Sequence, residues 1–221
     1  MTDYRKEFIR EMEKVSYRTS MTDVFSDFVK IYALVMEHAT VVRPADVDRV
    51  EGLHSGLIGK YSHEDMAHFN KMGDVVRDSL EHRRESFLGP VLEEIGASNK
   101  NNGQFMTPAS VANMMARVNV ADVEYTPGKV IRVSDPACGA GVMLIANGEA
   151  LIQERHVAQC DILLIGGDID GRACDITYIE LTLLGYAARV DHMDALTMKV
   201  LSPPRWTLGY FLHAMPMRGV R

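Results

Sequence analysis

The sequence predicts an α/β protein in which a helical N-terminal region precedes a Rossmann-like domain. Apolar residues recur at helical spacing through the first part of the chain, a strand, a glycine turn and a helix succeed one another over residues 130–152, and a second such unit begins at Ile162. The polar, asparagine-rich segment 97–106 separates the two parts. We therefore expect domains at 1–96 and 97–221.

Composition limits the classes of function. The chain has 221 residues, of which 47% are hydrophobic and 24% charged, as in ordinary globular proteins. Its net charge of −6 argues against a strongly basic surface, so DNA is expected to bind weakly or through a local basic patch. The three cysteines lack CxxC spacing and suit a reducing cytoplasm. No apolar run reaches membrane-spanning length, so we expect a soluble, cytoplasmic protein without a membrane partner.

Helix signals recur through the N-terminal region. Apolar residues spaced three or four apart over 22–39 predict a core-facing helix. Pro44 begins a second helix, and Ser62 is expected to cap a third over 63–82. A last amphipathic segment ends at Gly96.

Two polar groups in this region could suggest binding sites. His63 and His68 lie five positions apart, which places them on different faces of a helix, so no metal site is expected. The HRRE run at 82–85 is interpreted as a solvated helix face, with a contact to phosphate as the alternative.

The Rossmann-like part begins with a helix and the glycine turn. Thr107 is expected to cap the helix and Pro108 to open it, with one apolar face made of Val111, Met114, Met115 and Val118. The strand that starts at Val130 stops at Asp135 and turns through two glycines into a helix. Such a turn lets backbone N–H groups approach a ligand, but its spacing fits neither the dinucleotide fingerprint nor the P-loop.

The segment DPACGAG, with GQFMTP upstream, resembles S-adenosylmethionine-dependent DNA adenine methyltransferases, specifically the modification subunits of type I restriction systems and their short phage or mobile-element relatives. The resemblance implies S-adenosylmethionine as the cofactor. It assigns cofactor contacts to Asp135, Gly139 and Gly141, the shape of the loop to Pro136, Ala137 and Cys138, and neighbouring positions to Phe105, Thr107 and Pro108. An ordinary capped helix is the alternative for the last two.

Two further strands are expected to complete the cofactor site. The apolar run from Ile162 ends near Asp168, which is placed to accept hydrogen bonds from a ribose or to cap a helix. Ile169 could pack on the adenine, while Asp170 is better explained as the cap of the following helix. A third strand over 187–193 leads to Asp194, which the resemblance places at the cofactor's adenine amino group and which is otherwise a turn residue.

The catalytic segment of the family has the form [DNS]PP[YFW], which the chain approaches in the residues Ser202, Pro203, Pro204, Arg205 and Trp206. Arg205 occupies the aromatic position, and Trp206 comes one place late. The short connection after Asp194 leaves no room for the helix and strand that should precede the motif, so a simple turn is the alternative.

The expected function is that of an S-adenosylmethionine-binding DNA adenine-N6 methyltransferase, because the cofactor motifs are intact. The alternative is a catalytically inactive cofactor-binding or interaction protein related to restriction-modification subunits, with an anti-restriction or regulatory role. Three clear strands are fewer than a complete methyltransferase sheet has, and the C-terminal segment could add at most one. An exposed sheet edge then needs covering, so a homo-oligomer or a partner chain that completes the sheet is expected.

Overall fold

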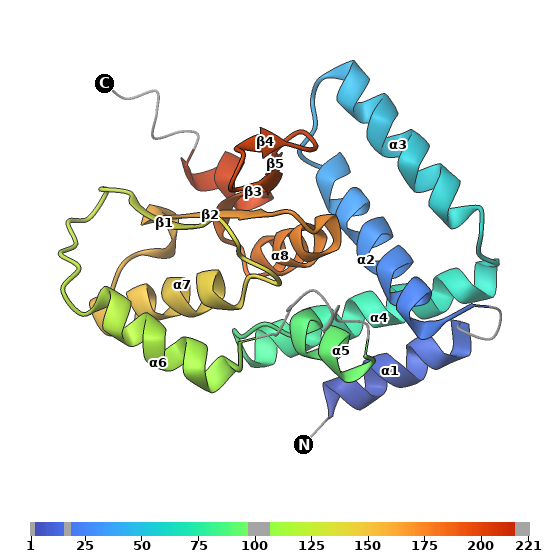
Figure 1. Cartoon of the computed structure of the whole chain (residues 1–221), viewed down its shortest axis with the longest axis horizontal. Helices are drawn as coiled ribbons and strands as arrows, with labels where there is room; N and C mark the ends of the chain where they lie inside the picture. The colour runs from blue at the N-terminus through green and yellow to red at the C-terminus, as the bar shows by residue number, and fades with distance from the viewer. Residues whose placement is uncertain (1–2, 16–18, 97–106, 215–221) are drawn as a thin grey trace.

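The computed structural model describes residues 3–15, 19–96 and 107–214 (Figure 1). The N-terminal helices are α1 (Tyr4–Val15), α2 (Met21–His38), α3 (Pro44–Ile58), α4 (His63–His82) and α5 (Leu88–Glu94). The expected domain boundary at residue 97 falls in a segment outside the described residues. No helix in the described ranges is both long and apolar enough to span a bilayer.

Local capping signals set the helix starts, as predicted. Ser62 and Asp65 form a capping box, in which the Ser62 side chain accepts from the Asp65 N–H and the Asp65 carboxylate accepts from the Ser62 N–H at 2.9 Å. Pro44 occupies the first position of α3, where its missing N–H carries no cost. The predicted helix over 63–82 is confirmed at both ends.

Aromatic rings fill the centre of the helical region. Phe8 meets Phe25, Phe28 and Phe87 edge to face, with ring centroids 5.3–6.2 Å apart. Each ring is at most 5% exposed, so each contributes about 1.5–3 kcal/mol by burial. The same hydrophobic core continues into the α/β part, where α2 packs against α8 (Gly171–Leu183).

The α/β part is built on three parallel strands in the order β1 (Ile131–Asp135), β2 (Ile162–Asp168) and β3 (Ala187–Asp194). Helix α7 (Val142–Arg155) connects β1 to β2, and α8 connects β2 to β3. Figure 1 shows α7 and α8 on one face of the sheet. The α/β class and the three predicted strands are confirmed.

The segment after β3 folds back on the strand it has just left. The two-residue strands β4 (Lys199–Val200) and β5 (Arg205–Trp206) pair antiparallel with β3, and a short helix, η3 (Tyr210–Ala214), follows. The expectation that the segment from Trp206 onward adds at most one strand agrees with β5, whereas β4, which lies before that segment, was not predicted. Both added strands lie on the β3 side of the sheet, so β1 forms the opposite edge of the described sheet.

Helix α6 (Ala109–Val120) differs from its prediction in two respects. Thr107 is not its cap, because Pro108 is the capping residue and no side-chain cap bond is present. The predicted apolar face of Val111, Met114, Met115 and Val118 also lies outside the core, since these side chains are 40–72% exposed. The buried face consists instead of Ala112, Ala116 and Val120, whose small side chains let α6 pack closely against α7.

Candidate functional site

Each of the three parallel strands ends on an aspartate. Asp135, Asp168 and Asp194 are the last residues of β1, β2 and β3. Because the carboxyl ends of parallel strands share one edge of a sheet, the three carboxylates lie along that edge. Open α/β sheets bind their ligands at this edge, so the predicted residues Asp135, Asp168 and Asp194 are brought together where a ligand is expected.

The glycine loop after β1 uses its two glycines differently. Gly139 has φ +53° and Gly141 has φ +76°, so both lie in the left-handed region. A Cβ placed on Gly139 would meet nothing within 4 Å, whereas a Cβ on Gly141 would lie 2.9 Å from Thr177 Oγ1. The backbone at Gly139 is therefore open to a ligand, while Gly141 permits close packing on α8.

Hydrogen bonds fix the loop to the neighbouring elements. The Gly139 N–H donates to Asp168 Oδ2 at 2.8 Å, and the Cys138 N–H donates to the Gly167 carbonyl at 2.9 Å. From α8, the Thr177 hydroxyl donates to the Gly139 carbonyl at 2.8 Å. Sequence reasoning missed this role of Thr177, a hydroxyl at a fully buried position of α8.

Asp168 joins the loop to the start of α8. Its Oδ1 accepts from the Asp170 N–H at 2.9 Å, so each carboxylate oxygen holds one backbone N–H and keeps a lone pair for a further donor. Asp170 caps α8 by accepting from the Arg172 N–H, as predicted. The Ile169 side chain between them is 62% exposed and offers an apolar surface at the same edge.

Asp194 is held in a tight turn. Its carboxylate accepts from the Leu196 N–H at 2.9 Å and from the Thr197 hydroxyl at 2.7 Å. The Thr197 hydroxyl, followed by the two backbone N–H groups, lowers the pKa of Asp194, so the group is a charged acceptor at neutral pH. These hydrogen bonds agree with the alternative in which Asp194 is a turn residue. Its contact with the adenine amino group of the cofactor stays a prediction.

The remaining predicted cofactor residues have different surroundings. Pro136 and Ala137 are exposed, and the Ala137 N–H donates to Asp135 Oδ1 at 3.1 Å. Burial raises the pKa of the Cys138 thiol, which therefore stays protonated and shapes the loop rather than acting as a nucleophile. Thr107 and Pro108 lie immediately before α6, and Phe105 falls outside the described residues.

The predicted catalytic segment lies elsewhere in the sheet. Trp206 pairs with Arg189 and Arg205 with Val190, near the start of β3 and away from its carboxyl end. Strands β2 and β3 separate this segment from β1. The structure therefore does not bring Ser202, Pro203, Pro204 and Trp206 to the glycine loop, and a catalytic role for them stays a prediction.

The side chains of this segment are engaged in packing. Arg205 is 9% exposed, donates to Asp175 at 2.5 Å and lies over the Tyr178 ring at 4.9 Å. Trp206 contacts the Tyr210 ring with centroids 4.0 Å apart. The arginine at the aromatic position of the motif therefore serves a buried ion pair.

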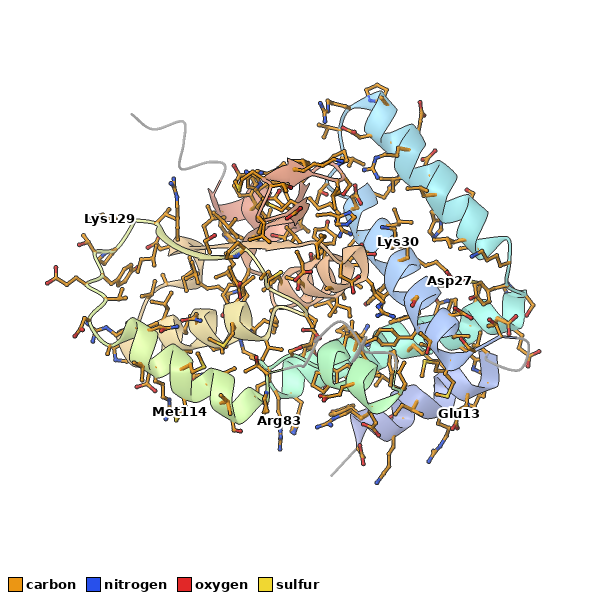
Figure 2. The ribbon with its side chains drawn as sticks, in the orientation of Figure 1. Glu13, Asp27, Lys30, Arg83, Met114 and Lys129 are labelled. Carbon is orange, nitrogen blue, oxygen red and sulfur yellow. The ribbon has the colours of Figure 1, made fainter. Side chains whose placement is uncertain are left out.

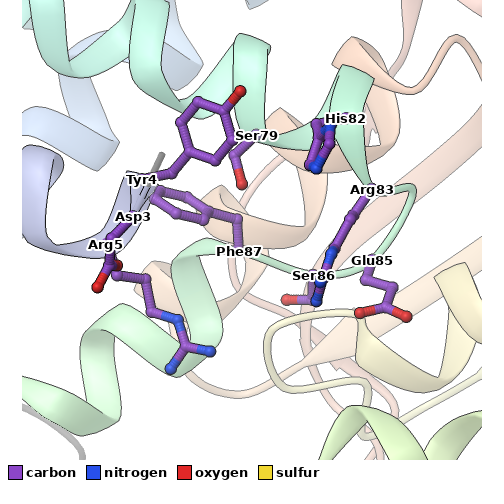
Figure 3. A pocket seen from close by; sticks show the side chains of 9 residues that line it. All are labelled: Asp3, Tyr4, Arg5, Ser79, His82, Arg83, Glu85, Ser86 and Phe87. Atoms are coloured by element: carbon purple, nitrogen blue, oxygen red, sulfur yellow. The ribbon is translucent and has the colours of Figure 1, made fainter. Parts of the chain in front are cut away.

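One residue of the HRRE run, Arg84, connects the N-terminal region to the α/β part. Arg84 Nε donates to Glu149 Oε1 at 2.7 Å, and the Tyr186 hydroxyl donates to the same oxygen at 2.6 Å. The interpretation of 82–85 as a solvated face is thus wrong for Arg84. The other three residues line a cavity of about 310 Å³ beside the start of α1 (Figure 3), and none of the predicted cofactor residues borders it.

The histidines on α4 do not face each other. His68 Nδ1 lies 2.7 Å from Glu11 Oε2 and links α4 to α1, whereas His63 is exposed at the first position of the helix. No cluster of metal-ligating side chains occurs within the described ranges.

Comparisons with known proteins agree with this geometry. The family model described as N-6 DNA Methylase matches residues 77–207, more than half of the chain. No curated protein matches. Among solved structures, a candidate class I S-adenosylmethionine-dependent methyltransferase from Listeria monocytogenes is similar, with a TM-score of 0.50 and 15% identity over 93% of this chain. The chain spans 57% of the length of that protein.

Proposed function

Because the chain belongs to the N-6 DNA methylase family, we propose that it binds S-adenosylmethionine at the carboxyl edge of β1, β2 and β3 and takes part in adenine-N6 methylation of DNA. S-adenosylmethionine is the cofactor that this family implies. The observation that carries the proposal is the row of strand-terminal aspartates beside a glycine loop whose backbone is open at Gly139.

The groups at this edge fit the chemistry of the cofactor. Asp168 keeps free lone pairs for ribose hydroxyls, and Asp194 is a charged acceptor for an adenine amino group. Ile169 offers an apolar surface to the adenine ring. Asp135, at the start of the loop, would accept from the ammonium group of the methionine part. The ribose, the adenine and the ammonium group of the cofactor thus each have a complementary group at this edge of the sheet.

The residues of this chain hold and orient the cofactor. S-adenosylmethionine supplies a methyl group on a positively charged sulfur, which a nitrogen nucleophile can attack. An adenine would have to leave the DNA helix to present its N6 to that methyl group. The described Ser202–Trp206 segment lies away from the loop, so the proposal rests on the cofactor side of the reaction.

We also propose that this chain acts in a restriction-modification system. Its support is the resemblance of DPACGAG and GQFMTP to the modification subunits of such systems. DNA is the proposed substrate on family grounds, and with a net charge of −6 its binding would depend on a local basic patch.

Calorimetric titration of S-adenosylmethionine tests the cofactor site. We expect the wild type to bind and Asp168→Ala and Asp194→Ala to weaken binding by about tenfold or more, since each removes a hydrogen-bond acceptor. Asp48→Ala, which removes an exposed carboxylate on α3, is the matched control and should bind normally. Absence of binding by the wild type would refute the proposal.

Methyl transfer is tested separately. The protein is incubated with unmethylated DNA and S-adenosylmethionine, the DNA is digested to nucleosides, and N6-methyl-2′-deoxyadenosine is measured by mass spectrometry. Transfer that Asp168→Ala abolishes would support the enzyme. Cofactor binding without transfer would favour a binding protein instead.

A further inference from the structure

The connection between β2 and α8 carries two of the proposed cofactor groups. Asp168 ends β2, Ile169 follows it, and Asp170 caps α8. Asp168 Oδ1 accepts from the Asp170 N–H at 2.9 Å, and this N–H belongs to the peptide unit between Ile169 and Asp170. Because a peptide unit is planar and trans, its C=O and N–H point in opposite directions and turn together. A group that holds the Ile169 carbonyl therefore also orients the Asp168 carboxylate.

A side chain of β3 holds that carbonyl. His192 Nε2 lies 3.1 Å from the Ile169 carbonyl oxygen. His192 is opposite Asp168 in the pairing of β2 with β3, so both side chains lie on the same face of the sheet. Since a carbonyl oxygen only accepts, Nε2 carries a proton and donates, which both the neutral ring and the imidazolium can do. The hydrogen bond is thus compatible with either charge state of His192.

The start of α8 leaves room for the imidazole ring. A Cβ on Gly171, the first residue of α8, would lie 3.2 Å from His192 Cε1 and 3.5 Å from its Nε2. Carbon atoms pack best at about 3.5–4.0 Å, so a larger residue would push the ring away from the helix backbone. Helix α8 is itself fixed to α2, whose Lys30 donates to Asp175 Oδ1 at 3.3 Å (Figure 2). The ring therefore lies between β3 and an anchored helix.

We propose that His192 is a positioning residue of the cofactor site, which holds the Ile169–Asp170 peptide so that Asp168 presents its carboxylate to the ribose of S-adenosylmethionine. This inference rests on the proposed function, in which Asp168 accepts from ribose hydroxyls. Without His192 the peptide unit can rotate, and Asp168 Oδ1 then loses its N–H donor. The carboxylate would have to be ordered during binding, which costs affinity. His192 itself needs no contact with the cofactor.

Calorimetric titration of S-adenosylmethionine into the full chain tests the donor. Asparagine and glutamine distinguish the two ring nitrogens, because the glutamine amide nitrogen takes roughly the place of Nε2 and that of asparagine roughly the place of Nδ1. We expect His192→Asn to weaken binding about three- to tenfold, as for the loss of one hydrogen bond, and His192→Gln to stay within about twofold of the wild type. His63→Ala is the matched control, since His63 is exposed at the start of α4, and it should bind normally.

A double-variant cycle separates positioning from a general structural role. If His192 acts through Asp168, adding His192→Asn to Asp168→Ala should weaken binding by less than about twofold more, because the carboxylate that it orients is already gone. A purely structural role would lower affinity by the same factor in both backgrounds. Urea denaturation of each variant gives its free energy of unfolding, so that loss of folded protein is measured separately from loss of affinity.

Three results would overturn the inference while the wild type binds S-adenosylmethionine. The first is normal binding by His192→Asn, and the second is binding by His192→Gln that is as weak as that of His192→Asn. The third is a loss on His192→Asn that persists in full in the Asp168→Ala background. A wild type that does not bind S-adenosylmethionine refutes the proposed function itself, and this inference with it.

Discussion

Gly139 and Gly141 share a loop and a positive φ but differ in their surroundings, which allows strain and packing to be separated. Alanine at either position adopts a left-handed backbone at a cost of about 1–2 kcal/mol. At Gly139 nothing else is met within 4 Å, so Gly139→Ala should destabilise the fold by about that amount. At Gly141 the new methyl group lies 2.9 Å from Thr177 Oγ1 and 3.0 Å from Thr177 Cγ2, which adds about 1–3 kcal/mol of overpacking.

Gly139→Ala should weaken cofactor binding more than Gly141→Ala does, which is the reverse of their order in stability. The Cβ of Gly139→Ala projects into the space where the backbone is open to a ligand, so affinity for S-adenosylmethionine should fall by about tenfold or more, which is about 1.4 kcal/mol. The Cβ of Gly141→Ala faces α8 instead, so the folded fraction of that variant should lose less affinity. Urea denaturation measures the stability of each variant, and calorimetry measures the affinity.

Two results would refute this reasoning. Equal stability of the two variants would show that the contact with Thr177 has no energetic weight, and unchanged affinity of Gly139→Ala would show that the cofactor does not approach the loop there. Thr177→Ala removes both this contact and the hydroxyl bond to the Gly139 carbonyl, so the double variant Gly141→Ala, Thr177→Ala should lose less stability than the sum of the two single variants.

Three further predictions concern buried polar groups. Thr177→Val removes the hydroxyl that holds the glycine loop, so stability should fall by about 1–3 kcal/mol and calorimetry should show weaker cofactor binding. Arg205→Met should destabilise by about 3 kcal/mol in urea denaturation, since Lys30, at 3.3 Å, is then the remaining cationic partner of Asp175 among the described residues. Burial raises the pKa of Glu180 from 4.5 to about 7, so the folded protein holds a proton that the unfolded chain releases. The stability of the wild type relative to Glu180→Gln should therefore fall by on the order of 3 kcal/mol as the pH rises from about 4.5 to 7, and a flat difference would contradict the cause given.

Local signals in the sequence account for most of the elements. Ser62 and Asp170 cap the helices they were expected to cap, because a side-chain oxygen next to the first free N–H groups is a short-range interaction. The strand at Ile162 was predictable because its apolar run is too short and too continuous for an amphipathic helix. The shared edge of Asp135, Asp168 and Asp194 was predictable as well, because each aspartate was expected at the end of a parallel strand.

Features that depend on tertiary packing were not predictable in this way. The apolar stripe of α6 gives no information on which side faces the rest of the protein, and the small residues Ala112 and Ala116 take the inner side because they allow closer approach to α7. Nothing in the sequence around Thr177 indicates which element its hydroxyl contacts, because the glycine loop that it supports comes from a distant part of the chain. Both outcomes depend on long-range contacts that a single sequence does not specify.

The position of the Ser202–Trp206 segment follows from the length of the chain between strands. A parallel strand on the far side of β1 requires a crossover connection of about a dozen residues or more, usually containing a helix. Residues 195–204 instead contain the turn at Asp194 and β4, which pairs antiparallel with β3. The Ser202–Trp206 segment therefore lies along β3 and away from the glycine loop, despite its similarity to a catalytic motif. Within the described residues, the edge of β1 opposite β2 stays unpaired for the same reason.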